Sequence, residues 1–351
     1  MYLTRLLSKH FSLKTSRRNT FVGIIKSLLL NRGVHYKQMA EMVKGAAKLD
    51  SKIKRIYRFL SEDNVGEEKF LNFMETLLPT GRYWLSIDRT NWQYGHIDRN
   101  IFTLSICLGG IAMPLMFRTL SHKGASCAED QIKLIEDFIN RFGKDRIECV
   151  LADREFDSER FIRYLHMSSI PFCIRVRKHN RIKHSNGLYV RIDKYLGNSI
   201  LNNVKTKLYD IPINLDLINM DTGGLLAVVA SDKINDPIKL YSSRWDIETA
   251  FKGCKTNGFR IEDSHIIDRK RMDNLIRCIF IAFAIAVKTG VIKHSIEPIK
   301  VKKTLQSKAY SFLQYGLNFI KQAFSQTNGA FNKIFRLLTL PYTIPPPIFV
   351  Q

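Results

Sequence analysis

The spacing of apolar positions separates helical from extended stretches along the chain. Apolar residues recur every three or four positions across residues 19–78, as at Phe21 and Ile25, and this spacing predicts helices. Short apolar runs broken by glycine and polar positions follow over residues 82–118, and they predict three strands joined by tight turns. Residues 1–80 are therefore expected to form an N-terminal helical region.

The pattern over residues 81–177 alternates between strands and helices. After the three strands come a helix over residues 128–142, a strand over 147–152, a helix capped by Ser158 and a strand over 171–176. The order β-β-β-α-β-α-β implies a mixed sheet with helices packed against it. We therefore predict an α/β fold, and these residues form the first part of its core.

The second half of the chain changes character twice. Residues 178–235 are polar with short β-like pieces, which predicts a β-rich insertion. Residues 236–295 favour helices, over 237–256 and 272–289, and are expected to complete the core; residues 296–351 are predicted to form a basic C-terminal helical region. The clearest β-like pieces of the insertion are residues 188–192, 207–211 and 225–230.

The charge balance points to a polyanionic partner. Among 351 residues, 55 are Lys or Arg and 32 are Asp or Glu, which gives a net charge of +23. A surplus of this size favours nucleic acid, because neutralised phosphates release condensed counterions; an incidentally basic protein is the other interpretation. Hydrophobic residues make up 45% of the chain, which supports a large packed core and argues against a disordered protein.

The basic surplus begins at the N-terminus. Residues 1–40 contain no Asp or Glu but several Lys and Arg, a composition shared by transit peptides and DNA-binding arms. This stretch continues into a helical pattern with no small-residue cleavage site, which favours a DNA-binding arm. The helix predicted over residues 51–60 sets Lys54 and Arg58 on or beside the face opposite its apolar residues, and they fit DNA contact and an ordinary solvated surface equally well.

Neither cysteines nor histidines show metal-ligand spacing. The six cysteines contain no C-x-x-C pair and suggest no disulfide framework, so we expect a reducing, intracellular compartment. None of the nine histidines forms a short-range metal pair, and His96 and His122 are expected to be structural or to lie near DNA. The most apolar run, over residues 278–287, is too short to span a bilayer and predicts a buried helix.

Two carboxylates, Asp88 and Asp153, each end a short apolar strand of the predicted core. A strand end is a good ligand position, because the strand fixes the backbone while the side chain reaches solvent. Acids after strands are also common as turn starters and helix caps, so either residue alone would be weak support for a site. As a pair they are the first candidates for chemistry.

A third element adds a carboxylate beside basic residues. On the helix that opens the second part of the core, Tyr241, Arg244, Glu248 and Lys255 fall within a stripe of about 60°. An i, i+4 pair such as Arg244–Glu248 is also common on solvated helix surfaces. Trp245 flanks the stripe, however, and favours a partly buried, shaped surface.

Three carboxylates of this kind suit metal-assisted phosphodiester chemistry. Two Mg²⁺ or Mn²⁺ ions about 3.5–4 Å apart supply a nucleophile and stabilise the leaving oxygen, and such ions prefer oxygen ligands. In this hypothesis Asp88 bridges both ions, Asp153 completes one metal site and Glu248 completes the other. The other three residues of the stripe would hold DNA phosphates alongside.

The same residues resemble a known signature. Tyr241-Ser-Ser-Arg244-Trp-Asp-Ile-Glu248 and, after six more residues, Lys255 are similar at every fixed position to the helix signature of insertion-sequence family four, a branch of the DDE transposases. Asp153-Arg154-Glu155-Phe156 resembles the family's Asp-Arg-Gly-Phe, with Glu155 in place of the glycine. Ser86-Ile87-Asp88-Arg89-Thr90 resembles the strand that carries the family's first aspartate.

The resemblance covers about residues 20–290 and implies a ribonuclease H-like core, interrupted before the glutamate by the β-rich insertion. It implies binding of terminal inverted repeats, metal-dependent nicking that frees a 3′-OH, and joining of that hydroxyl to target DNA. It also implies a homodimer in the active complex, a bacterial cytoplasmic, nucleoid-associated location and no membrane partner. We expect Arg154 and Trp245, which lie within the motifs, to contact DNA.

Two other functions stay open on the sequence. One is a nuclease of the same fold without strand transfer, and the other is a basic DNA-binding or repressor protein with an inactive core. A hairpin step on the transposon end also stays open, because some relatives stack a flipped base on a tryptophan of the insertion, whereas Trp84, Trp92 and Trp245 lie outside it here. The aromatic residues that could substitute are Tyr189, Tyr195 and Tyr209.

Overall fold

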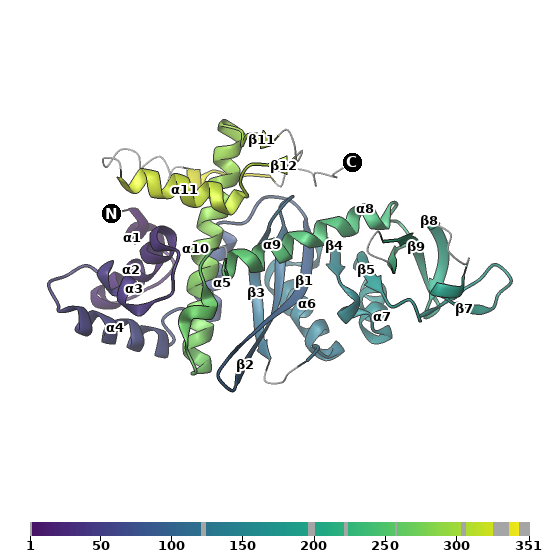
Figure 1. The fold of residues 1–351 in the computed structure, drawn as a ribbon, viewed down its shortest axis with the longest axis horizontal. Helices are drawn as coiled ribbons and strands as arrows, with labels where there is room; N and C mark the ends of the chain where they lie inside the picture. Colours follow the sequence, from purple (N-terminus) through teal and green to yellow (C-terminus); the bar gives the residue numbers. More distant parts are fainter. Residues whose placement is uncertain are drawn as a thin grey trace.

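A central sheet has helices packed on its faces. The N-terminal helices form a bundle beyond one edge of this sheet (Figure 1). The computed structural model describes residues 2–120, 124–195, 201–220, 224–256, 258–302, 307–325 and 337–343. The long helix α10 (Arg269–Ile296) contacts both parts, through α2 (Thr15–Asn31) and α4 (Leu49–Ser61) on one side and β3 (Ala112–Leu120) on the other. The bundle and the sheet therefore share one continuous core.

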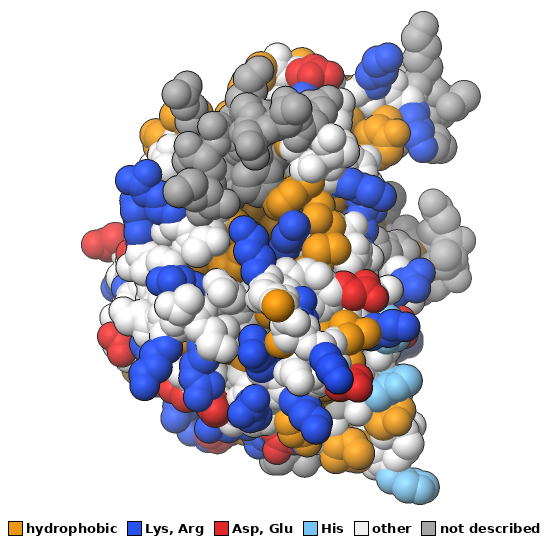
Figure 2. All heavy atoms as spheres, turned by 90° about the vertical axis from the view of Figure 1, so that its left-hand side faces the viewer, with side chains coloured by type: hydrophobic (Ala, Val, Ile, Leu, Met, Phe, Trp, Pro, Cys, Tyr) orange, Lys and Arg blue, Asp and Glu red, His pale blue; other side chains and the backbone are white. Residues whose placement is uncertain are grey.

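Aromatic residues fill the inside of the N-terminal bundle, and the helical prediction for residues 19–78 is confirmed. The ring of Phe21 on α2 stacks on Phe59 of α4 with centroids 5.5 Å apart. The outer surface is basic: Lys54 and Arg58 of α4 are exposed, and Lys and Arg side chains spread across this end of the molecule (Figure 2). The other helices here are α1 (Tyr2–Ser8), α3 (Tyr36–Glu41) and α5 (Glu67–Glu75).

The described residues form one large mixed sheet of ten strands, in the order β3-β2-β1-β4-β5-β10-β9-β8-β6-β7. Strands β1, β4 and β5 run parallel, and the other neighbours are antiparallel. The order β-β-β-α-β-α-β predicted up to residue 176 is confirmed. The strands are β1 (Tyr83–Tyr94), β2 (Ile97–Cys107), β3, β4 (Ile147–Ala152), β5 (Phe172–Val176), β6 (Arg181–Lys183), β7 (Tyr189–Arg191), β8 (Leu201–Leu208), β9 (Ile211–Asn219) and β10 (Leu225–Ser231).

The first of the two helices between the core strands has the predicted bounds, and the second begins after Ser158 as predicted. Helix α6 (Ala128–Phe142) packs on β3, and α7 (Glu159–Met167) packs against α6. Ser158 caps α7 by accepting a hydrogen bond from the backbone N–H of Phe161 at 3.3 Å, as its position predicted. These local signals were strong because apolar periodicity and a capping residue agree.

The first strand is longer than the sequence indicated, because Asp88 does not end it. Strand β1 continues to Tyr94 and forms a hairpin with β2, with register pairs as far as Tyr94 and Ile97. The polar stretch after Asp88 hid this extension, since a half-exposed hairpin needs few apolar residues. Asp88 therefore lies in mid-strand rather than at a strand end.

The predicted β-rich insertion contains strands, but they are not a separate sheet. Strand β10 pairs with β5 of the core, so residues 178–235 extend the core sheet. The strand predicted over residues 207–211 is wrong, because it spans the turn between β8 and β9. Tyr209 and Asp210 have φ of 54° and 63°, which is the conformation of a two-residue hairpin turn.

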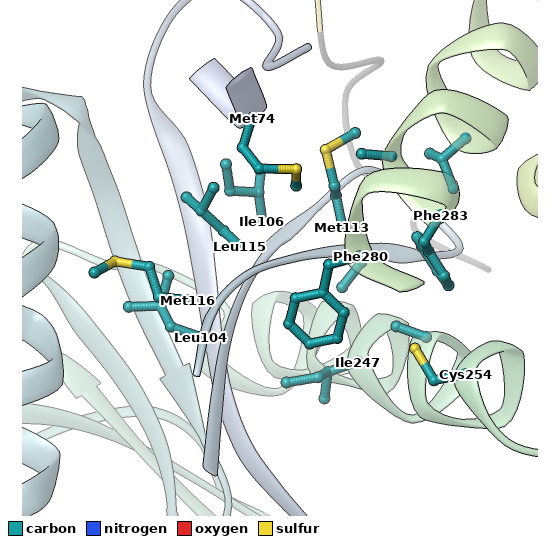
Figure 3. Close-up of a cluster of buried hydrophobic side chains, with 14 of the residues drawn as sticks. Met74, Leu104, Ile106, Met113, Leu115, Met116, Ile247, Cys254, Phe280 and Phe283 are labelled. Atoms are coloured by element: carbon teal, nitrogen blue, oxygen red, sulfur yellow. The ribbon is translucent and has the colours of Figure 1, made fainter. Parts of the chain in front are cut away.

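The segment that carries the glutamate is helical but broken. Helix α8 (Pro237–Tyr241) leads through a 3₁₀ turn (Ser242–Arg244) into α9 (Trp245–Cys254). In Figure 3, Ile247 and Cys254 of α9 face Phe280 and Phe283 of α10 in one buried cluster. The Asp246 carboxylate accepts hydrogen bonds from the backbone N–H groups of Gly109 at 3.0 Å and Gly110 at 2.8 Å, which joins α9 to the turn between β2 and β3.

Helix α10 is long and apolar enough to cross a membrane by length and composition, but 94% of its most apolar window is buried inside the protein. This agrees with the buried helix predicted there. The C-terminal region contains α11 (Phe312–Ser325), which packs on α10, and the short strands β11 (Val301–Lys302) and β12 (Ser307–Lys308). Other parts of the predicted C-terminal helical region, residues 303–306, 326–336 and 344–351, lie outside the described residues, as does His122.

Candidate active site

The sheet places Asp88 and Asp153 side by side. Strands β1 and β4 pair in parallel, and their last paired residues are Ile87 and Ala152. Asp88 and Asp153 are the next residues along each segment, so both stand where the parallel ladder stops. Beyond this point β1 continues to pair with β2, while the chain after β4 turns away through a 3₁₀ turn (Arg154–Phe156).

Arg244 joins the third carboxylate to the first. Its guanidinium Nη1 lies 3.2 Å from Oδ2 of Asp88, and its Nη2 lies 2.6 Å from Oε1 of Glu248. The arginine is buried, with 5% of its surface exposed, so this contact is well shielded from water. Asp88 and Glu248, from two separate segments, thus share one buried cation, while Asp153 follows the strand that pairs with β1.

Asp88 has a shifted pKa, set mainly by burial and secondarily by the charges around it. Burial raises the pKa of Asp88 to about 7; the backbone N–H of Arg89 opposes the shift, Asp153 adds to it, Arg244 opposes it and Glu248 adds to it. The single guanidinium therefore does not compensate the negative charge gathered here. A divalent cation would relieve this charge, because it would favour the ionised form of each carboxylate.

The donor set suits Mg²⁺ or Mn²⁺ chemically, but the side chains need to move to bind one. Carboxylate oxygens are the ligands these hard cations prefer. Among the described residues, no three His, Cys, Asp or Glu side chains stand close enough together to hold a metal ion. The guanidinium of Arg244 lies between Asp88 and Glu248, so a metal site there requires that guanidinium to leave.

Two aromatic rings support the arginine. The Arg244 guanidinium lies 5.4 Å from the ring centre of Tyr241 and 5.3 Å from that of Trp245, at cation–π distances. Tyr241 is 4% exposed, which does not fit the direct DNA contact expected for it; it holds Arg244 instead. Trp245 is 57% exposed, so its ring is accessible to a ligand beside the acids.

Lys255 is not on the same helical stripe, because α9 ends at Cys254. Its ammonium donates to the backbone carbonyl of Asn91 at 2.7 Å and lies 3.1 Å from Oε1 of Glu262. Lys255 therefore ties the end of α9 to the part of β1 beyond Asp88. A DNA phosphate would have to compete with Glu262 for it, whereas Arg154 is exposed beside Asp153.

Sequence reasoning missed a second charged cluster, built on Glu155. The Glu155 carboxylate accepts from Arg89 Nε at 3.0 Å and Nη2 at 2.9 Å, and from the backbone N–H and hydroxyl of Ser126 at 3.0 and 3.1 Å. Arg89 also donates to Asn100 at 3.0 Å. The available signal was the placement of opposite charges just after each candidate aspartate, at Arg89 and Glu155.

This second cluster is electrostatically satisfied. Burial alone would raise the pKa of Glu155, but hydrogen bonds and charge from Arg89, with further hydrogen bonds from Ser126, outweigh it and leave that pKa lowered. Asp153 contributes to the same turn by accepting a hydrogen bond from the backbone N–H of Glu155 at 2.8 Å. Glu155, which stands where the similar family motif has a glycine, thus holds the turn that carries Asp153.

Other candidate residues lie away from the acids. His96 is exposed at the turn between β1 and β2. Tyr189 lies on β7, at the far end of the sheet (Figure 1), and its hydroxyl donates to Asp210. Tyr195 and Tyr209 are partly buried. These positions do not select one tyrosine as the residue that would stack on a flipped base in a DNA hairpin step.

Comparison with known proteins points to one family over part of the chain. Residues 125–285 match the family described as "Transposase DDE domain", a stretch that includes Asp153 and Glu248 and begins after Asp88. Among solved structures, the chain is similar to the piggyBac transposase in a synaptic complex with hairpin DNA, at 12% identity and a TM-score of 0.46, over 95% of this chain and 78% of that one. The search of curated proteins found no match.

Proposed function

We propose that this protein is a DNA transposase of the DDE type, from insertion-sequence family four. It binds the terminal inverted repeats of its element, cuts DNA with divalent ions held by Asp88, Asp153 and Glu248, and joins the freed 3′-OH to target DNA. The observation that carries the proposal is the placement of these carboxylates: Asp153 lies beside Asp88 where the β1–β4 ladder stops, and Arg244 joins Glu248 to Asp88. The match to a transposase DDE domain supports the same reading.

In this proposal the chain's own residues prepare the site. Asp88 and Asp153 are held in position by two paired strands, and Glu248 by a helix fixed to α10 and to the turn between β2 and β3. Bound metal ions would activate the attacking oxygen and stabilise the leaving one. Arg244, released from the acids, would be free to meet a DNA phosphate.

The proposal also covers the type of core, the residues that contact DNA and the oligomeric state of the active complex. We propose a ribonuclease H-like core, supported by the observed order of strands and helices up to β5. Arg154, Lys255 and the exposed Trp245 would contact DNA around the acids. The active complex would be a homodimer, because two transposon ends must be joined, and it would act on DNA in the cytoplasm of a bacterium, at the nucleoid.

Cleavage of a labelled terminal-repeat duplex in Mg²⁺ tests this function. Asp88→Asn, Asp153→Asn and Glu248→Gln should each lower the cleavage rate by roughly 10²–10³-fold or more, because each weakens the binding of the divalent ions that would stabilise the reacting phosphate. Binding of the same duplex should persist. Glu136→Gln, an exposed acid on α6, is the matched control and should cleave like the unaltered protein.

The same assay separates the alternatives. A transposase converts a pre-cut end with a free 3′-OH into a joined product, whereas a plain nuclease cuts and never joins. A DNA-binding repressor with an inactive core would bind the duplex and give neither product. Cleavage that persists in all three acid variants would eliminate the assigned site.

A further inference from the structure

A polar cavity lies where the N-terminal bundle meets the chain that follows the glutamate helix. It has a volume of about 370 Å³. One wall comes from the end of α2 and the start of α3, with Arg32, His35 and Gln38, and the other from the turn after α9, with Thr256, Gly258 and Arg260. Segments more than 200 residues apart in the sequence therefore build one site.

The lining of this cavity is suited to an anion. Every lining residue is polar or glycine, two are arginines, and none is a carboxylate. The Arg32 guanidinium donates to the side-chain amide oxygens of Gln314 at 3.1 Å and Asn318 at 2.7 Å, so neutral partners fix its direction without neutralising it. Burial lowers the pKa of Arg32, which reflects the cost of keeping an uncompensated cation there.

One wall of the cavity packs directly against the end of α9, the helix that carries Glu248. The backbone N–H of Arg260 donates to the carbonyl of Lys255 at 2.9 Å. A Cβ at Gly258 would lie 1.7 Å from the carbonyl oxygen of Gly253 on α9, so only glycine allows this close approach. Arg260 therefore belongs to the turn that packs directly against the end of the helix of Glu248.

We propose that this cavity binds a phosphate group of the DNA backbone, through the guanidinium groups of Arg32 and Arg260. The proposal rests on the proposed function, since it supplies a phosphate contact for the same DNA. Guanidinium groups bind phosphate oxygens with charge-assisted hydrogen bonds, and Arg260 is exposed and lines the cavity. The contact would couple DNA binding by the N-terminal bundle to the position of the glutamate helix.

Salt-dependent DNA binding by Arg260→Gln tests the cavity. The logarithm of the binding constant of a terminal-repeat duplex is measured against the logarithm of salt concentration. Removing one phosphate contact should reduce the slope by about 0.9 and weaken binding several-fold at low salt. Lys133→Gln, which removes an equally exposed charge on α6, is the matched control and should leave the slope unchanged. Arg260→Lys should restore most of the slope, and melting curves check that each variant folds.

A second measurement distinguishes DNA phosphate from free phosphate. Inorganic phosphate is titrated into the unaltered protein and into Arg260→Gln, followed by calorimetry. Loss of inorganic phosphate binding in Arg260→Gln, with an unchanged slope for DNA, would overturn the proposal in favour of a free-anion site. Loss of both would support the DNA contact.

The outcomes also separate this proposal from the proposed function. If Arg260→Gln behaves like Lys133→Gln while the unaltered protein still cuts the duplex in Mg²⁺, the cavity proposal fails and the transposase proposal stands. If the unaltered protein neither binds nor cuts the duplex, both fail together. A reduced slope in Arg260→Gln with cleavage retained supports both.

Discussion

Two acidic clusters lie within a few residues of each other on the same two segments, and they differ in how their charge is met. Asp88 and Glu248 share Arg244 while Asp153 lies beside Asp88, and burial raises the pKa of Asp88 to about 7. Glu155, two residues after Asp153, is also partly buried, yet its pKa is lowered. Strand β1 and the turn after β4 contribute residues to both clusters, and the segment of α9 adds Arg244 and Glu248 to the first.

Burial raises the pKa of both carboxyls, and the two differ in the donors that oppose it. Glu155 has most of the Arg89 guanidinium and both donors of Ser126. Asp88 shares one arginine with a second acid and faces a third. A carboxylate that has its own hydrogen-bond donors stabilises the fold. Neighbouring carboxylates whose negative charge is not balanced by nearby cations are typical of a cation-binding site.

The largest expected effect tests the satisfied cluster. Glu155→Gln should lower the free energy of unfolding by about 3 kcal/mol, because it leaves the Arg89 guanidinium partly buried without its charged partner. Urea unfolding followed by circular dichroism measures this change. Glu248→Gln, in the crowded cluster, should change stability by less than about 1 kcal/mol, since it removes repulsion as well as attraction. Equal losses in the two variants would remove the distinction between the clusters.

A buried lysine that has no carboxylate partner extends the comparison to a positive charge. Here removing the charge should raise the free energy of unfolding instead of lowering it. Burial lowers the pKa of Lys288 on α10 to about 8, and its ammonium donates to the carbonyl of Thr76 at 3.1 Å. Lys288→Met should therefore stabilise the protein at pH 7 by about 2 kcal/mol, the cost of the buried charge less the lost hydrogen bond.

The pH dependence of this difference follows from linkage. Below about pH 8 the lysine is protonated in both states, so its cost is full and constant. Between pH 8 and 10.5 the unfolded chain binds more protons, and the unaltered protein gains stability as pH rises. The advantage of Lys288→Met measured by urea unfolding should thus shrink across this window, and a constant advantage would contradict the assignment.

The smallest expected effect tests whether the crowded acids take up a cation. Mg²⁺ at ten times its dissociation constant should stabilise the protein by about 1.4 kcal/mol, read as a rise in melting temperature without DNA. Asp153→Asn should lose this rise. Arg244→Met should melt earlier without Mg²⁺ but gain more from it, because the competing guanidinium is gone. The same rise in all three proteins would place the ion elsewhere.

Local sequence patterns predicted much of the fold. The helix over residues 128–142 and the strand over 147–152 have the predicted bounds, because their periodicity and flanking residues agree. The errors lie where long-range pairing decides the outcome. The extension of β1 to Tyr94, and the turn at Tyr209 and Asp210, depend on partner strands that no local window contains.

For the site, the sequence by itself determined the chemistry of the candidate side chains and the spacing of the motifs that carry them. Only the tertiary structure decided that β1 and β4 stop pairing just before Asp88 and Asp153, that Arg244 stands between Asp88 and Glu248, and that Glu155 belongs to Arg89. The physical reason is that burial and charge compensation depend on which segments meet in space. A carboxylate's neighbours set its pKa, and in this protein most of them come from distant parts of the chain.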